Sequence, residues 1–288
     1  MFQILEKEEL VSGITRMVIE APLIARKIKS GQFIILRTHQ QGERFPFTVA
    51  DANPEAGTIT IIFAQVGKSS GQLALYEVGD SILDVVGPLG IASKFTPDLK
   101  KVAVVGGGLG CAIAFPQAKA LHNMGVSVDI IAGFKTKDII ILEKEMSAVS
   151  DNLYISTDDG TFGTHGFVTD VLKEQIESGI KYDLVVAIGP IPMMKFVSKL
   201  TKEYGIKTIV SMNPIMIDGT GMCGCCRLIV DGKMKFACVD GPDFDGHLVD
   251  FDSAMLRLSM YDELQERERD CNLFKIADNM GERSSREV

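Results

Sequence analysis

The stretch Lys101-Val-Ala-Val-Val-Gly-Gly-Gly-Leu-Gly110 runs a compact apolar strand directly into a glycine-rich turn. The residues that follow, Cys111 to Met124, have helical spacing. A strand, a glycine turn and a helix in this order are typical of dinucleotide-binding folds, in which the helix presents free amides to a pyrophosphate. The turn lacks the full G-x-G-x-x-G spacing, and glycines also form tight turns that bind no ligand.

Further apolar strands alternate with helical segments after this turn. They are expected at residues 126–132, 153–156, 184–188 and 208–211. Because parallel strands need helical crossovers, this alternation predicts a doubly wound parallel sheet. The residues before the turn differ, since short β segments are separated there by Gly, Pro and Asp; examples are 14–19, 33–38, 58–66 and 81–86. That spacing predicts an antiparallel β barrel.

Four of the six cysteines fall within residues 223–238. Cys223 and Cys226 keep a two-residue gap, and Cys238 is a distant third thiol, as in the ligand spacing of plant-type [2Fe-2S] ferredoxins. Asp218 stands where the first cysteine of that pattern would be, so three thiolates and one carboxylate are the predicted ligands. Cys225 is the spare thiol. Glycines between these residues let the backbone wrap closely around a cluster.

Zinc, a disulfide knot and chance clustering are the alternatives. Zinc sites usually show two paired Cys or His units, and of four histidines only His247 lies near the motif. Cys111 and Cys271 are isolated and no signal peptide opens the chain, so a reducing, cytoplasmic location is expected. A net charge of -8 provides no basic surface for nucleic acid, and no run of eighteen apolar residues indicates a membrane span.

The ordered motifs resemble the ferredoxin-NADP reductase superfamily over nearly the whole chain. Within it, they are similar to the iron-sulfur flavoprotein subunits typified by the electron-transfer subunit of dihydroorotate dehydrogenase. The family's first flavin segment looks like residues 44–48, Arg-Phe-Pro-Phe-Thr. The resemblance implies that Thr48 lies near the flavin ring and that Phe45, Pro46 and Phe47 line the cofactor. Arg44 stands one residue before the usual arginine position, which puts its phosphate contact in question.

A second flavin segment of the family looks like residues 62–70. The resemblance implies cofactor contacts from Ile62, Phe63 and Ala64, and pyrophosphate contacts from Ser69 and Ser70 at a helix start. As an alternative, residues 68–71 are simply a polar turn. Residues 87–90, Gly-Pro-Leu-Gly, match a motif that these reductases place between their domains, which supports a boundary near residue 96.

The family's nucleotide-binding segments also have counterparts. The resemblance implies NAD(H) contacts from the glycine turn, from a Thr-Asp-Asp-Gly segment and from an Ala-Ile-Gly-Pro segment; the residues are Gly106, Gly107, Gly108, Gly110, Asp158, Asp159, Gly189, Pro190 and Met193. Acidic residues favour NAD over NADP, because they accept from a free ribose 2′-hydroxyl and repel a 2′-phosphate. A surface turn at 157–160 is the alternative. Ile188 replaces the cysteine that the family places beside the nicotinamide.

These motifs predict four parts, an FAD-binding β barrel (1–96), an NAD-binding α/β domain (97–211), a [2Fe-2S] cluster segment (212–250) and a C-terminal helical tail (251–288). An aspartate at the first ligand position resembles the small subunits of NADH-dependent reduced ferredoxin:NADP oxidoreductases. That resemblance implies an electron-bifurcating heterodimer whose larger subunit carries its own FAD and [4Fe-4S] clusters and handles NADP(H) and ferredoxin. The alternatives are an electron-transfer subunit of NAD-dependent dihydroorotate dehydrogenase, a sulfide dehydrogenase subunit, or a non-catalytic iron-sulfur sensor.

Overall fold

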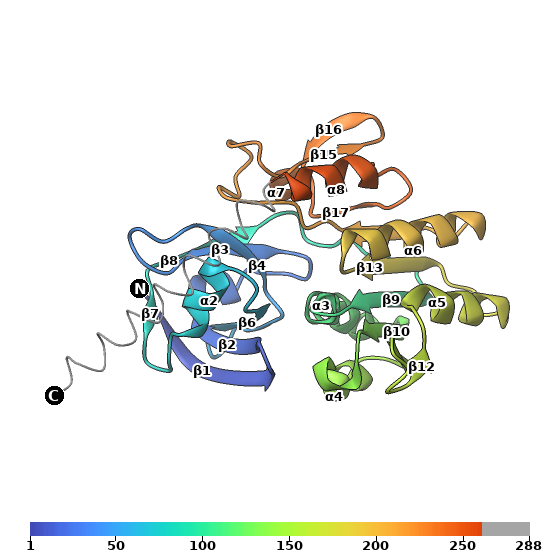
Figure 1. Cartoon of the computed structure of the whole chain (residues 1–288), viewed down its shortest axis with the longest axis horizontal. Coiled ribbons are helices and arrows are strands. Elements are labelled where there is room, and N and C mark those ends of the chain that lie inside the picture. The colour runs from blue at the N-terminus through green and yellow to red at the C-terminus, as the bar shows by residue number, and fades with distance from the viewer. Residues whose placement is uncertain (261–288) are drawn as a thin grey trace.

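The computed structural model describes residues 1–260 of the chain. Its amino-terminal part is a barrel of two antiparallel sheets with the short helices α1 (Pro22–Ala25) and α2 (Lys68–Ala74) (Figure 1). The strands are β1 (Phe2–Val11), β2 (Ile14–Glu20), β3 (Phe33–Arg37), β4 (Phe45–Thr48), β5 (Asp51–Asn53), β6 (Thr58–Ala64), β7 (Ser81–Ile82) and β8 (Asp84–Leu89). One sheet has the order β5-β6-β2-β1-β7 and the other β4-β3-β8.

The second part is a seven-stranded sheet of order β12-β11-β10-β9-β13-β14-β17, which is parallel except for its last strand. The strands are β9 (Lys101–Gly107), β10 (Ser127–Phe134), β11 (Asn152–Thr157), β12 (Thr164–His165), β13 (Leu184–Ile188), β14 (Thr208–Ser211) and β17 (Asp243–Asp245). The connecting helices are α3 (Gly110–Asn123), the short 3-10 turn η1 (Lys137–Ile139), α4 (Glu143–Ala148), α5 (Val168–Glu177) and α6 (Ile191–Glu203).

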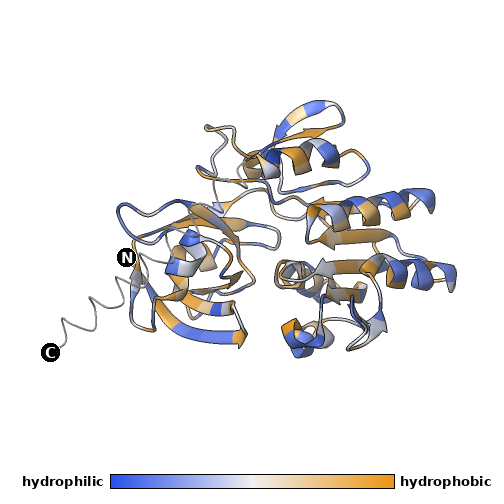
Figure 2. Cartoon of the chain, in the orientation of Figure 1, coloured by the Kyte–Doolittle hydropathy of each residue, from blue (hydrophilic) through white to orange (hydrophobic). Residues whose placement is uncertain are grey.

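Alternation along the central strands explains why helices cover both faces of this sheet. Val102 and Val104 of β9 pack under α3 and α4, whereas Ala103 and Val105 pack under α5 and α6. Since successive side chains of a strand point to opposite faces, a wholly apolar run requires cover on both sides. Figure 2 shows these strands as hydrophobic and the outer surfaces of α5 and α6 as largely hydrophilic. The predicted barrel and doubly wound sheet are confirmed.

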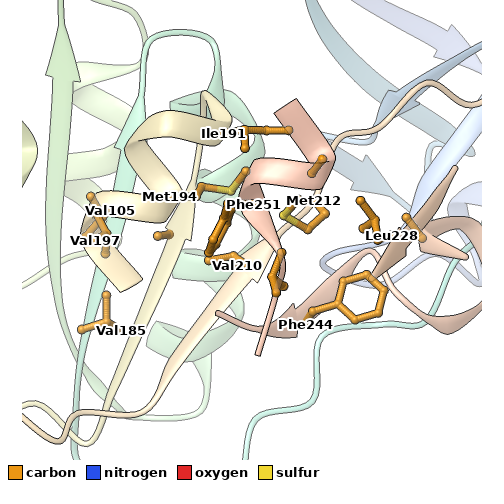
Figure 3. Close-up of a cluster of buried hydrophobic side chains, with 14 of the residues drawn as sticks. Val105, Val185, Ile191, Met194, Val197, Val210, Met212, Leu228, Phe244 and Phe251 are labelled. Atoms are coloured by element: carbon orange, nitrogen blue, oxygen red, sulfur yellow. The ribbon is translucent and has the colours of Figure 1, made fainter. Parts of the chain in front are cut away.

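The remaining elements form a small unit beside the sheet. They are β15 (Arg227–Val230), β16 (Lys233–Phe236), α7 (Ala237–Asp240) and α8 (Phe251–Ser259). Phe251 of α8 lies in one hydrophobic cluster with Met194 of α6 and Met212, so this unit shares a core with the seven-stranded sheet (Figure 3). Strand β17 adds to that sheet from within the predicted cluster segment. Of the predicted tail, residues 261–288 lie outside the described residues.

A polar contact at Asp243 joins three parts of the chain. Its carboxylate accepts from Ser93 Oγ at 2.6 Å, and Gln117 Nε2 of α3 lies 3.4 Å from both carboxylate oxygens. Gln117 is fully buried and its Oε1 has no hydrogen-bond partner. Although part of residue 243 reaches the surface, burial of its carboxyl group raises the pKa of Asp243 above its usual value.

The stability of Asp243→Asn relative to the wild type is therefore expected to increase as the pH rises. The folded chain holds the Asp243 proton at a pH where the unfolded chain has lost it, so wild-type stability falls as the pH rises above about 4. Asparagine has no such titration, and its amide can donate toward Gln117 Oε1. Thermal midpoints of both proteins at about pH 4 and about pH 8 measure this effect. An unchanged difference between the two midpoints would contradict it.

Candidate functional site

A cavity of about 600 Å³ opens at the carboxyl ends of β9, β10, β11 and β13. Five of the residues predicted to bind NAD(H) line it, namely Gly107, Gly108, Asp158, Pro190 and Met193. The sheet order reverses direction between β9 and β13, and open α/β sheets bind their ligands in the crevice at such a point. The cavity therefore lies where the fold favours a nucleotide.

Aromatic residues that the sequence did not single out also line this cavity. Phe134 ends β10, Phe167 precedes α5 and Phe196 lies on α6, and Lys135 adds a positive charge. Phe167 and Phe196 are 63% and 59% exposed, which is unusual for large apolar side chains. Phe196 lies outside the buried stripe of α6. An aromatic residue off the apolar face of a helix is a feature of the sequence that could have indicated a ligand site. The rings of Phe167 and Phe196 supply flat apolar surface for a ligand.

The glycines of the turn after β9 have different tasks. A Cβ on Gly110 would lie 2.4 Å from the carbonyl oxygen of Ile188, so this glycine permits close packing of α3 on β13. A Cβ on Gly106 would lie 2.8 Å from Cys111 Sγ. Gly108 has a φ of +55° with open space around it, as expected of a residue that faces a cavity. Gly106 and Gly110 thus pack the turn, while Gly107 and Gly108 line the cavity.

The two predicted aspartates differ in their surroundings, and only Asp158 lines the cavity. Asp159 Oδ1 accepts from Thr161 N at 3.0 Å and from Thr161 Oγ1 at 2.7 Å, and these bonds lower the pKa of Asp159. On the other side of the turn, Ile188 is 2% exposed and packs under α3, so it offers the cavity no reactive group.

The first flavin segment forms β4. Phe45 and Phe47 pack against the barrel core, with ring centroids 5.2 Å apart, and Phe47 lies 5.4 Å from Phe63. Since side chains alternate along a strand, Pro46 and Thr48 face away from that core. Phe63 is 1% exposed, which leaves its side chain no surface for a cofactor. On this geometry, Pro46 and Thr48 are the residues of β4 best placed to face a ring.

The second flavin segment is divided between two surroundings. Ile62 packs in a core cluster of the seven-stranded sheet, and Ala64 is half-buried. Ser70 Oγ accepts from Gly67 N at 3.1 Å, which closes the first turn of α2, and Ser69 Oγ donates to Glu43. Both hydroxyls therefore have partners within the chain. The first backbone amides of α2, like those of any helix, have none within the helix.

The predicted cluster loop, residues 218–226, wraps against the barrel. Gly219, Gly221 and Gly224 have φ values of +82°, +87° and +70°, a conformation that favours glycine. A Cβ on Gly219 would lie 2.8 Å from Leu89 Cδ1 and 2.9 Å from Ile35 Cγ1. The loop thus lies directly on β3 and β8, the strands that share a sheet with β4.

The four predicted ligands fall into two pairs. Cys226 and Cys238 are buried with their Sγ atoms 3.2 Å apart, and Cys223 is exposed near Asp218. A backbone hydrogen bond from Cys225 lowers the pKa of Cys223, whereas burial raises the pKa of Cys238 to about 12. No three His, Cys, Asp or Glu side chains among residues 1–260 are arranged to hold a single ion. A [2Fe-2S] cluster takes four protein ligands for two irons, so two pairs fit it.

The Asp218 carboxylate is held in place by its own loop. Its Oδ2 accepts from Thr220 Oγ1, from Thr220 N at 2.9 Å and from Met222 N at 3.3 Å, which together lower the pKa of Asp218. Oδ1 remains for a ligand bond. His247, the one histidine near the motif, instead places Nε2 3.1 Å from Thr201 Oγ1. These contacts favour an iron-sulfur cluster over zinc.

Comparison with known proteins decides the family. Residues 213–250 match the family model described as the iron-sulfur cluster binding domain of dihydroorotate dehydrogenase B. A Thermotoga maritima homolog of the dihydroorotate dehydrogenase B (NAD(+)) electron transfer subunit is 43% identical over 92% of this chain and 93% of its own length. The Clostridium perfringens subunit is 34% identical over 85% of this chain and 96% of its own. The chain belongs to the family of dihydroorotate dehydrogenase B electron-transfer subunits.

Two solved structures are similar to this electron-transfer subunit, to different degrees. The structure of an NADH-dependent reduced ferredoxin-NADP oxidoreductase, studied for flavin-based electron bifurcation, matches with a TM-score of 0.90 and 40% identity over 94% of this chain and 97% of the other. A cytochrome P450 reductase from Amycolatopsis matches with a TM-score of 0.60 and 19% identity over 70% of this chain and 65% of its own, which shows the fold alone.

Membership of this family confirms several predictions. The chain is a flavoprotein oxidoreductase subunit for electron transfer, and its cofactor classes are a flavin, a nicotinamide dinucleotide and an iron-sulfur cluster. An electron-transfer subunit implies a larger catalytic partner. The individual contact residues and the domain boundaries stay predictions. No helix within residues 1–260 is both long and apolar enough to cross a membrane.

Proposed function

We propose that this chain is the small subunit of an electron-bifurcating NADH-dependent reduced ferredoxin:NADP oxidoreductase. The observation that carries the proposal is Asp218, which stands where the ligand spacing of plant-type [2Fe-2S] ferredoxins has its first cysteine and so resembles the small subunits of these oxidoreductases. Its carboxylate is oriented by the loop beside three thiols, two of them in contact. The solved oxidoreductase that is 40% identical supports the same choice.

The residues of this chain would bind and orient the reactants. The cavity beside β9 would hold NAD(H), with Asp158 accepting from the ribose and Pro190 and Met193 beside the nicotinamide. Thr48 would face the flavin ring from β4. A bound flavin supplies the conversion between two-electron hydride transfer and single-electron transfer. Asp218, Cys223, Cys226 and Cys238 would hold the cluster on the sheet that carries Thr48.

The surface around the cluster loop fits a protein partner. Met222, Ile217 and Val239 are 87%, 47% and 42% exposed, although all three are apolar. Exposed apolar side chains that gather at one place on a soluble protein are typical of an interaction site. In this proposal they contact the larger subunit, which carries its own FAD and [4Fe-4S] clusters. Ferredoxin and NADP(H) would then react at the partner.

Co-purification from the native cells under anoxic conditions tests this function, with flavin and iron assayed on the same sample. A larger partner with a second FAD and [4Fe-4S] clusters would support it. The second candidate, pyrimidine synthesis, is favoured by the family model that matches residues 213–250. A dihydroorotate dehydrogenase catalytic subunit as partner would establish that candidate and refute the first. Absence of flavin would refute both.

Asp218→Cys is expected to leave a bound cluster but to shift its reduction potential and its electron paramagnetic resonance spectrum. Sulfur is a softer donor than carboxylate oxygen, and cluster potentials follow ligand type and hydrogen bonding. Redox titration followed by spectroscopy measures both changes. Asp252→Cys, at an exposed carboxylate on α8 that pairs with Lys195, controls for an added thiol. If the spectrum and potential of Asp218→Cys matched the wild type, Asp218 would not be a ligand.

A further inference from the structure

Arg44 connects the flavin strand to the cluster loop. It directly precedes β4, and its guanidinium reaches residues 173 and 174 positions away in the sequence. Nε donates to the carbonyl oxygen of Ile217 at 3.2 Å, and Nη2 donates to that of Asp218 at 3.3 Å. The side chain is half-buried. Two donors of one rigid group therefore hold two successive carbonyls, the second of which belongs to a predicted cluster ligand.

This geometry leads to a different role for Arg44 from a flavin phosphate contact. We infer that Arg44 is a positioning residue, which fixes the cluster loop on the flavin strand so that Asp218 is held at a set place relative to Thr48. The planar guanidinium suits this task, because its donors are fixed relative to one another and remain charged at any physiological pH. The consequence for electron transfer rests on the proposed function, whereas the attachment of the loop does not.

The packing around the attachment agrees with this role. Gly219 lies close to Ile35 of β3 and Leu89 of β8, and Arg44 adds a contact from the residue that directly precedes β4. Thr48, the last residue of β4, lies four residues after Arg44, or about 13 Å at the usual rise of a strand. The cluster loop and Thr48 are thus attached to the same small sheet. Arg44, which directly precedes β4, links that sheet to the start of the loop.

Asp218 is then held from two sides. Thr220 and Met222 orient its carboxylate from within the loop, and Arg44 holds its main chain from the barrel. Loss of the internal contacts would free only the carboxylate, whereas loss of Arg44 would free the start of the loop. Arg44 also places a positive charge beside the cluster position, and such a charge raises a reduction potential because it stabilises the reduced state.

The test uses the full chain, prepared with its cofactors and any partner, as the wild type, Arg44→Gln and Arg44→Lys. Three readouts are taken: bound flavin per chain, the spectrum and potential of the cluster, and hydrogen exchange of the amides in residues 217–222. We expect Arg44→Gln to keep its flavin, to lower the cluster potential, and to speed amide exchange in the loop about tenfold, since it removes charge-assisted hydrogen bonds. In Arg44→Lys the cluster potential should stay close to that of the wild type, whereas the loop amides should still exchange faster. Lysine keeps the positive charge but lacks the two fixed donors of the guanidinium.

Arg16→Gln is the matched control, since Arg16 lies on the barrel strand β2 and pairs with Glu8 at 2.8 Å, away from the loop. It should change none of the three readouts. Loss of flavin in Arg44→Gln, or loop exchange equal to that of the wild type, would overturn the inference. Failure of the proposed function would appear instead in the wild type, as missing flavin or a different partner, and loop exchange would still test the role of Arg44.

Discussion

Cys226→Ser is expected to abolish cluster assembly in this subunit. Cys226 is 2% exposed, and its Sγ lies 3.2 Å from that of Cys238, so the two thiols already form half of a binding site. Serine offers a hard, poorly ionised oxygen in place of a thiolate, and iron-sulfur clusters are held by thiolates. Iron and acid-labile sulfide should fall to background, and the spectrum of the reduced cluster should disappear.

Cys225→Ser is the matched control for this prediction. Cys225 is half-buried in the same loop, and its carbonyl accepts from Arg257 Nη2 at 3.4 Å, but its thiol belongs to neither pair. The variant should retain iron, sulfide and spectrum. If Cys225→Ser lost the cluster while Cys226→Ser kept it, the ligand register would be shifted by one residue. Thermal midpoints of both variants without iron would separate cluster loss from misfolding.

Local apolar runs made most of the fold predictable. The predicted strands at 184–188 and 208–211 coincide with β13 and β14, since each is a short apolar run between helical segments. Strand β1 (Phe2–Val11) lies in the part predicted to be short β segments but is not one of the segments named above. Its sequence contains the run Glu6-Lys-Glu-Glu9, and such residues form a strand only because pairing with β2 and β7 provides the backbone partners. The segment 81–86 divides into β7 and β8, which belong to different sheets.

The candidate site was predictable where its residues are neighbours in sequence. The cluster loop lies within nine residues plus Cys238, and the glycine turn directly follows β9, so motif spacing was sufficient for both. Phe134, Phe167 and Phe196 come from three separate elements and meet only when the sheet and its helices are folded. The contact of Arg44 with the cluster loop is equally non-local. The spacing of residues in the sequence is enough to predict a motif. Which distant side chains lie next to that motif depends on tertiary packing.

Gly110→Val is expected to lower the free energy of unfolding by about 3 kcal/mol or more, because it disrupts the seven-stranded sheet, and to abolish NADH oxidation. A Cβ at this position would lie 2.4 Å from the Ile188 carbonyl oxygen and 2.7 Å from Gly189 Cα. Both are backbone atoms, so no side chain can move aside, and α3 must separate from β13 at the edge of the nucleotide cavity. Thermal unfolding should show a midpoint about 10 °C lower. NADH oxidation with an artificial acceptor should be lost, while cluster ligands on the other side of the sheet are untouched.

Gly205→Ala separates this backbone overlap from the general cost of replacing a glycine. Gly205 follows α6 with a φ of +67°, and a Cβ there would meet no atom within 4 Å. Alanine should therefore cost only the strain of the left-handed conformation, about 1 kcal/mol, with a midpoint shift of about 3 °C and NADH oxidation retained. Equal losses in the two variants would mean that α3 can move away from β13 at little cost. In that case the close approach of helix and strand would not be what shapes the nucleotide cavity.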